Sequence, residues 1–227
     1  MSGIARNLEA VRAAIAAVAR RAGRDPGGMR LVAVSKTVDL ERLREAAAAG
    51  QKLFGENYLQ EAAAKIAALG PGLKWHLVGH LQTNKAKGAV ELFDLIHAVD
   101  RLKLAQALEA AATRLGKVQD VLIQVNQGGE DTKSGVTPEA APALVQVVAR
   151  LPHLRILGLM SMPPWFPDPE EARPYFRALR ELRDRLRDLT GLPLAELSMG
   201  MSGDFEVAVE EGATLVRVGT AIFGGRR

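Results

Sequence analysis

Apolar residues recur along the chain in short runs that alternate with longer stretches of helical spacing. Short apolar runs of this kind are typical of parallel strands that are buried on both faces. They predict strands at residues 31–35, 53–55, 75–79, 95–99, 121–125, 156–160, 196–199 and 215–223. Helical spacing predicts helices at residues 4–22, 39–49, 59–69, 101–115, 137–150, 169–189 and 204–211.

The alternation of strands and helices predicts an α/β fold with a parallel sheet. Eight such units favour closure into a (β/α)8 TIM-type barrel, which commonly forms one domain of this size. We therefore expect a single domain over residues 1–227. Only four residues follow the strand at 215–223, so the N-terminal helix is expected to replace a missing last outer helix. An open doubly wound sheet is the alternative, although no Gly-x-Gly-x-x-Gly sequence follows the first strand.

Composition narrows the class of protein. Of 227 residues, 48% are hydrophobic and 25% are charged, which is typical of a soluble globular chain with a large core. The absence of cysteine excludes disulfides, thiolate metal sites and cysteine nucleophiles. A net charge of +4 suits an anionic small molecule as well as nucleic acid. Because no basic run is interleaved with aromatic residues, nucleic acid is not the expected partner.

Three further expectations concern metal, compartment and assembly. His76 and His80 have the spacing of a helical metal pair, but His76 falls in a predicted strand, so no metal is expected. The N-terminus lacks the apolar core of a signal peptide, and no apolar stretch reaches the length of a membrane span. The expected compartment is therefore the cytoplasm, with no membrane partner. The largely charged outer helices show no self-association stripe, which favours a monomer.

Lys36 is the one lysine of nine that closes an apolar strand. Functional residues of these barrels cluster at the C-terminal ends of strands. Burial at such a position disfavours the ammonium form and frees the amine to attack a carbonyl, so Lys36 is a candidate for an imine with an aldehyde. A strand-end lysine that points into solvent is the alternative, and position alone does not decide between them.

Two small-residue segments near the C-terminus are candidates for phosphate binding. Residues 198–204 form a turn that opens the short helix at 204–211, where backbone N–H groups and the Ser202 hydroxyl suit an anion. Gly219 and Thr220 supply a second close backbone approach. The loops after the seventh and eighth strands are where barrels commonly bind phosphate. Either segment alone could be an ordinary turn, but together they favour a site.

Arg217 and Asn57 are further candidates. Arg217 is a charge inside an apolar strand, and burying it without an acceptor would be costly. A structural ion pair with Glu56 or Glu196 is one explanation, and contact with a ligand is the other. Asn57 ends the second strand and would lie beside Lys36 if the first two strands are neighbours. A turn or helix-cap role is the alternative for Asn57.

These residues fall in longer motifs, and the motifs resemble the pyridoxal phosphate homeostasis proteins, the YggS/PROSC group. The resemblance covers nearly the whole chain, and several of its motifs are specific to that family. The motifs are AVSKT at 33–37, FGENYLQE at 54–61, WHLVGHLQTNK at 75–85, GLMSM at 158–162, LSMGMSGDF at 197–205 and VRVGTAIFG at 216–224.

The resemblance implies a barrel like the N-terminal domain of alanine racemase, with pyridoxal 5'-phosphate held as a Schiff base on Lys36. It also implies that Arg217 faces the pyridine nitrogen and that Asn57 lies beside the ring. The phosphate would be held by Ser202, Gly219 and Thr220. An arginine opposite the ring nitrogen disfavours its protonation and weakens the ring as an electron sink. His76 belongs to a signature motif, but the resemblance assigns it no role.

The sequence is compatible with three functions, of which cofactor homeostasis is the expected one. The resemblance implies a protein of cofactor homeostasis that stores, buffers or delivers pyridoxal phosphate to apo-enzymes, with no catalytic residue. The alternative is a pyridoxal phosphate-dependent racemase or decarboxylase. That alternative needs an acid/base group on the opposite ring face, for which Tyr58 is the one plausible candidate. A third possibility is a sugar-phosphate barrel in which Lys36 is only a cationic contact.

Overall fold

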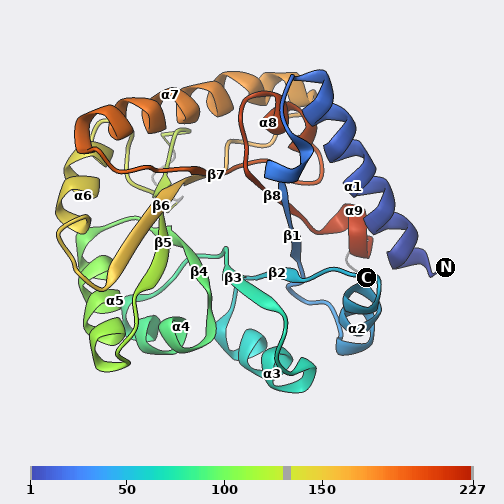
Figure 1. Ribbon diagram of the computed structural model, residues 1–227, viewed down its shortest axis with the longest axis horizontal. Helices are drawn as coiled ribbons and strands as arrows, with labels where there is room; N and C mark the ends of the chain where they lie inside the picture. Colours follow the sequence, from blue (N-terminus) through green and yellow to red (C-terminus); the bar gives the residue numbers. More distant parts are fainter. Residues whose placement is uncertain (1, 130–133, 226–227) are drawn as a thin grey trace.

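The computed structural model describes residues 2–129 and 134–225. The described residues form eight parallel strands that pair in sequence order and close into a barrel, with β1 beside β8 (Figure 1). The predicted (β/α)8 barrel is therefore confirmed. Its strands are β1 (Arg30–Val34), β2 (Leu53–Glu56), β3 (Lys74–Leu77), β4 (Leu95–Val99), β5 (Gln119–Val125), β6 (Leu154–Ser161), β7 (Glu196–Ser198) and β8 (Leu215–Val218).

Helices surround the barrel, and they include the seven that the hydrophobic pattern predicts (Figure 1). The α-helices are α1 (Gly3–Arg21), α2 (Leu40–Ala48), α3 (Leu59–Leu69), α4 (Ala86–Leu92), α5 (Leu102–Arg114), α6 (Ala141–Val148), α7 (Arg173–Thr190), α8 (Phe205–Glu210) and α9 (Thr220–Phe223). The described ranges also contain the short 3-10 helices η1 (Pro26–Gly28), η2 (Thr83–Lys85) and η3 (Pro169–Ala172). No helix in the described part of the chain is long and apolar enough to cross a membrane.

The N-terminal helix occupies the position of the last outer helix, as predicted. Its N-cap Ser2 accepts a hydrogen bond from the Ala5 backbone, and its apolar face is buried. It packs against α2, α8 and α9, which closes the ring of helices beside β1 and β8 (Figure 1). Leu8 and Val18 on that face are 0% and 1% exposed.

The structure corrects two expectations about secondary structure. The strand expected at 215–223 ends at Val218, because the chain turns at Gly219 and residues 220–223 form the single turn α9. A short apolar run does not distinguish strand from helix by its pattern alone. Helix α4 was not expected, since Lys87, Gly88 and its short length obscure the buried face formed by Ala86, Ala89 and Val90.

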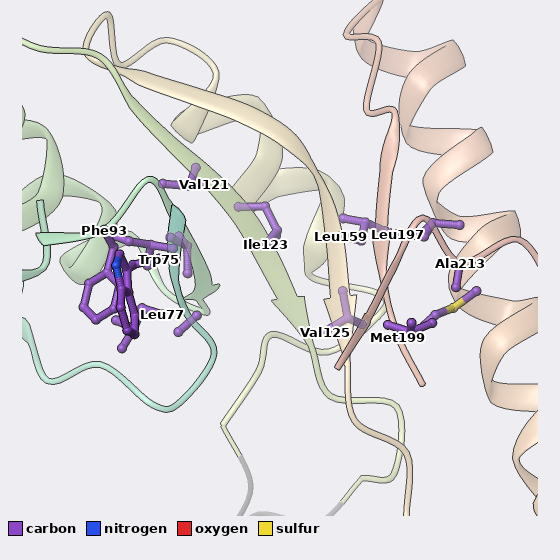
Figure 2. Close-up of a cluster of buried hydrophobic side chains, with 14 of the residues drawn as sticks. Trp75, Leu77, Phe93, Val121, Ile123, Val125, Leu159, Leu197, Met199 and Ala213 are labelled. Carbon is purple, nitrogen blue, oxygen red and sulfur yellow. The ribbon is translucent and has the colours of Figure 1, made fainter. Parts of the chain in front are cut away.

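The core has two layers. The larger layer lies between strands and helices, and Figure 2 shows part of it, including Trp75, Leu77, Val121 and Ile123. The smaller layer contains Val32, Val78, Leu95, Leu122, Met160 and Leu215. Alternate residues of a strand point to opposite faces. His76 on β3 and Val78 just after it therefore point into the barrel, and Trp75 and Leu77 point outward.

A β-bulge shapes the wall of the barrel next to β7. Val121 pairs with Ile156 but Leu122 pairs with Gly158, so β6 carries one extra residue at this point. A Cβ on Gly158 would overlap the carbonyl group of Glu196 in β7. Glycine therefore allows the close approach of β6 and β7, and this explains the first residue of the motif at 158–162.

Candidate functional site

A cavity of about 430 Å³ opens at the C-terminal ends of the strands. Loops after β1, β2, β3, β6, β7 and β8 contribute to its lining. It is lined by all six candidate site residues, namely Lys36, Asn57, Ser202, Arg217, Gly219 and Thr220, together with residues such as His80, Met162 and Trp165. Residues from six loops, far apart in the sequence, therefore meet in one cavity.

The backbone on both sides of Lys36 is held by β2 and α3. The Ser35 N–H donates to the Gly55 carbonyl at 2.9 Å, and the Ser35 hydroxyl donates to Glu56 Oε1 at 2.6 Å. On the other side, Thr37 has a φ of 62° and its N–H donates to Glu61 Oε1. A left-handed conformation is uncommon for threonine and needs such support.

Lys65 lies under this loop and was not singled out by the sequence. Its ammonium donates to the Ser35 carbonyl, Glu56 Oε1 and Glu61 Oε1 at 2.6, 2.8 and 2.6 Å, which uses all three of its donors. Burial raises the pKa of Glu56, while the bonds from Lys65 and Ser35 oppose that rise. Lys65 lies four residues after Glu61 in an otherwise apolar stretch, and this spacing is the sequence signal that could have revealed its role.

Arg217 is buried in β8, with 4% of its surface exposed. It donates from Nη1 to the Ser198 hydroxyl and from Nη2 to the Ser161 carbonyl at 2.8 Å. Burial lowers the pKa of its guanidinium to about 10, so Arg217 stays a cation at neutral pH.

The ion-pair explanation of Arg217 does not hold among the described residues. Glu56 is paired with Lys65, and Glu196 is paired with Arg30 at 2.5 Å. The Asp204 carboxylate, which lines the same cavity, interacts with Arg217 electrostatically, but the hydrogen-bond partners of Arg217 are neutral. A buried cation with neutral hydrogen-bond partners favours an acceptor or anion in the cavity that it lines.

The loop after β7 contacts the loop after β8 through the Ser202 hydroxyl. Ser202 Oγ accepts from the N–H groups of Gly219 and Ala221 at 3.3 and 3.4 Å. A Cβ on Gly219 would lie 3.1 Å from the Val34 carbonyl oxygen, so glycine suits this close approach to β1. Backbone N–H groups gathered with a hydroxyl are the donor set that phosphate requires.

Asn57 lies at the cavity wall beside Gly79. A Cβ on Gly79 would lie 2.7 Å from the Asn57 Cα atom, so glycine lets the loops after β2 and β3 touch. Helix α3 begins after Tyr58 without a side-chain cap. The helix-cap alternative for Asn57 is therefore not seen in the structure.

A chain of hydrogen bonds runs from Arg217 through the inside of the barrel. The Ser198 hydroxyl contacts His97 Nδ1 at 2.9 Å, and His97 Nε2 contacts His76 Nδ1 at 3.0 Å. Both rings are neutral, because burial lowers the pKa of His76 to about 3 and that of His97 well below its ordinary value. His97 and Ser198 are polar residues inside apolar strands, a signal that the sequence analysis did not use.

The two histidines with metal-pair spacing do not form a pair. His76 points into the barrel, whereas His80 lies in the following loop and contacts the Ser134 hydroxyl at 2.7 Å. Among residues 2–129 and 134–225 there is no group of three or more potential metal ligands.

Comparison with known proteins identifies the class to which this barrel belongs. The family model of the alanine racemase N-terminal domain matches residues 6–227. An alanine racemase of Clostridium difficile has the same fold, with a TM-score of 0.75 over 100% of this chain and 56% of that one, at 16% identity. The fold and the sequence thus define a barrel of the alanine racemase N-terminal type.

Closer relatives define the particular family. The pyridoxal phosphate homeostasis protein of Aquifex aeolicus is 50% identical over 91% of this chain and 91% of its own. That of Escherichia coli K12 is 44% identical over 100% of this chain and 98% of its own. The structure of PipY from Synechococcus elongatus with PLP bound has a TM-score of 0.87 at 41% identity, over 97% of this chain and 100% of PipY. This chain belongs to the family of pyridoxal phosphate homeostasis proteins.

Proposed function

We propose that this chain binds pyridoxal 5'-phosphate as a Schiff base on Lys36 and takes part in the intracellular homeostasis of the cofactor by storing, buffering or delivering it. The observation that carries the proposal is one cavity that Lys36, Arg217 and Ser202 line together, with Gly219 and Thr220 beside Ser202. PipY, a relative at 41% identity over the whole barrel, has PLP bound. Residues 1–227 would act as one cofactor-binding domain.

The residues of the cavity fit the three chemical parts of the cofactor. The Ser202 hydroxyl and the N–H groups of Gly219, Thr220 and Ala221 suit the phosphate. Arg217 suits the pyridine nitrogen, which would accept a hydrogen bond from its guanidinium, and Asn57 would lie beside the ring. Lys36 suits the aldehyde: its nitrogen adds to the carbonyl carbon, a C=N bond replaces the C=O bond, and one water leaves.

Arg217 favours holding the cofactor over using it for catalysis. A bound pyridoxal phosphate supplies an electron sink whose strength depends on protonation of the ring nitrogen. Arg217 is a cation with donors only, so it stabilises an unprotonated nitrogen and disfavours a protonated one. Its bonds to Ser198 and Ser161 hold the guanidinium in that position.

The acid/base candidate that the sequence offered for the alternative enzyme lies outside the lining of the cavity. Tyr58, its one candidate, is 62% exposed and is not among the residues that line the cavity. Racemase chemistry needs a group on each face of the reacting carbon. Cofactor homeostasis by binding therefore fits the structure better than racemase or decarboxylase activity does.

Borohydride reduction tests the Schiff base on the full chain. We expect reduction of the loaded protein to leave one pyridoxyl group on the peptide that contains Lys36, because reduction converts the imine to a stable amine. The measurement is peptide mapping by mass spectrometry, with unreduced protein as the control. An unmodified Lys36 peptide in fully loaded protein would refute the Schiff base.

Isotope exchange separates the binding protein from the enzyme. Incubating loaded protein with several amino acids in deuterated water should give α-proton exchange no faster than free pyridoxal phosphate does at the same concentration. The measurement is loss of the α-proton signal in the NMR spectrum of each amino acid. Exchange well above that of the free cofactor would establish catalysis and overturn the carrier function.

A further inference from the structure

A second cavity, of about 660 Å³, lies at the opposite end of the barrel from Lys36. Its walls are formed by α1, η1 and the N-terminal ends of strands β1 to β6. We call it the N-terminal cavity and define it by Ile15, Arg30, Lys52, Lys74, His76 and Leu157. It shares no lining residue with the cavity at Lys36.

His76 presents a hydrogen-bond donor to the N-terminal cavity. Ser198 is fully buried, and among the described residues its hydroxyl contacts only Arg217 and His97. Arginine can only donate, so His97 Nδ1 is the one acceptor for the hydroxyl hydrogen, which a buried hydroxyl needs. His97 then carries its hydrogen on Nε2 and donates it to His76 Nδ1, which leaves the hydrogen of neutral His76 on Nε2.

The Nε2–H donor of His76 has no protein partner among the described residues. The His76 residue is 5% exposed, and its remaining exposure is to this cavity. A nearly buried donor with no protein partner can bind an acceptor that enters the cavity, at little cost in lost hydration. An acceptor placed there would bind His76 Nε2–H, the last donor in the hydrogen-bond chain that starts at Arg217.

The charges around this donor favour an anion. Arg12, Arg30, Lys52 and Lys74 line the cavity, against Asp94 and Asp120. Both carboxylates are already engaged: Asp94 accepts from Lys74 at 2.7 Å, and Asp120 accepts from Arg155 at 2.6 Å. Arg30 is paired with Glu196, while Lys52 has no ion pair within residues 2–129 and 134–225.

The rest of the wall is apolar. Ile15 and Ala16 of α1, Met29 after η1, and Leu31, Leu53 and Leu157 at the strand ends contribute to it. Sites of this kind, with apolar walls and a few convergent polar groups, are typical of small-molecule binding. An organic anion with an apolar body matches both parts of the lining.

We propose that the N-terminal cavity binds a small carboxylic acid, with one carboxylate oxygen accepting the hydrogen of His76 Nε2 and with Lys52 supplying the opposite charge. The apolar body of the acid lies against α1 and Leu157. This site is separate from the one at Lys36, and it exists whether or not that site holds a cofactor.

The four histidines of the chain make the proposal testable by NMR. Protein labelled with nitrogen-15 in histidine is titrated with sodium hexanoate, and each ring nitrogen is followed. We expect the Nε2–H tautomer at His76 and a saturable shift of its resonances, with a dissociation constant of about 1 mM or tighter. His97 should shift less, and His80 and His153 should not shift.

Hexan-1-ol is the matched uncharged probe, and we expect it to bind roughly tenfold more weakly, because it lacks the charge that Lys52 and its neighbours select. Equal shifts from the alcohol and the carboxylate would overturn the proposal. So would an unmoved His76, or a larger shift at His97 than at His76, since the latter would place the probe at the other end of the barrel.

Substitution of Lys52 tests the charge without disturbing the interior. Lys52 is exposed, so Lys52→Gln should fold normally and bind hexanoate roughly twofold to fivefold more weakly. Lys87→Gln, which removes an exposed lysine from α4, is the control and should bind as the natural chain does. Identical affinities for the two variants would contradict the proposal.

Discussion

A Lys36→Ala variant is expected to bind pyridoxal phosphate at least about a hundredfold more weakly than the natural chain, a loss of about 2.7 kcal/mol. Without the amine, no C=N bond forms, and only the contacts to the phosphate and the ring remain. The loop should keep its shape, because Lys65, Glu56 and Glu61 hold it through Ser35 and the Thr37 backbone. Equilibrium binding followed by the absorption of the cofactor measures the effect.

Lys87→Ala is the control for this experiment, because Lys87 is exposed on α4 and, within the described residues, has only Glu91 as an ion partner, at 3.7 Å. Lys65 is the informative competitor, since it is buried directly under the same loop. Its three bonds to oxygen keep it from acting as a nucleophile. Tight binding by Lys36→Ala, or a pyridoxyl adduct on Lys65 in that variant, would show that Lys36 is not the anchor.

Gly158→Ala is expected to destabilise the protein by more than about 3 kcal/mol or to prevent folding. The added methyl group would overlap the Glu196 carbonyl group in β7, and backbone atoms on paired strands cannot move aside as a flexible side chain can. The barrel would have to separate β6 from β7. The measurement is the midpoint of urea unfolding followed by circular dichroism.

Gly28→Ala is the matched control for this substitution. A Cβ on Gly28 meets no atom within 4 Å, and the residue is exposed at the end of η1. Its unfolding midpoint should therefore stay close to that of the natural chain. If Gly158→Ala unfolded at the same urea concentration as Gly28→Ala, the close approach of β6 and β7 would not be what requires glycine.

The sequence predicted the long elements well and the short ones poorly. Helix α1 shows five buried apolar residues at helical spacing, and its place beside the last strand followed from the shortage of chain after 223. The short apolar run at 220–223 is compatible with either a strand or a helix, and the turn of the chain at Gly219 decides that it forms α9. Helix α4 has only seven residues, too few for a clear period.

The sequence predicted which residues line the candidate site, but not the residues that hold them in place. Lys36 and the loops after β7 and β8 were predicted because strand ends carry function in this fold. Lys65 was placed only on a helix, because nothing local indicates that its ammonium reaches three oxygens across the loop. The partners of Arg217 were also beyond the sequence, since Ser198 and Ser161 come from other strands.

By itself, the sequence determined the barrel, its closure by α1 and the motifs that carry the family, because these depend on local spacing and residue order. Only the tertiary structure decided that the hydrogen-bond partners of Arg217 are neutral, that His97 links Arg217 to His76 through Ser198, and that a second cavity lies at the far end of the barrel. These features depend on contacts between strands distant in sequence. The closed barrel turns alternate residues inward and so brings those side chains together.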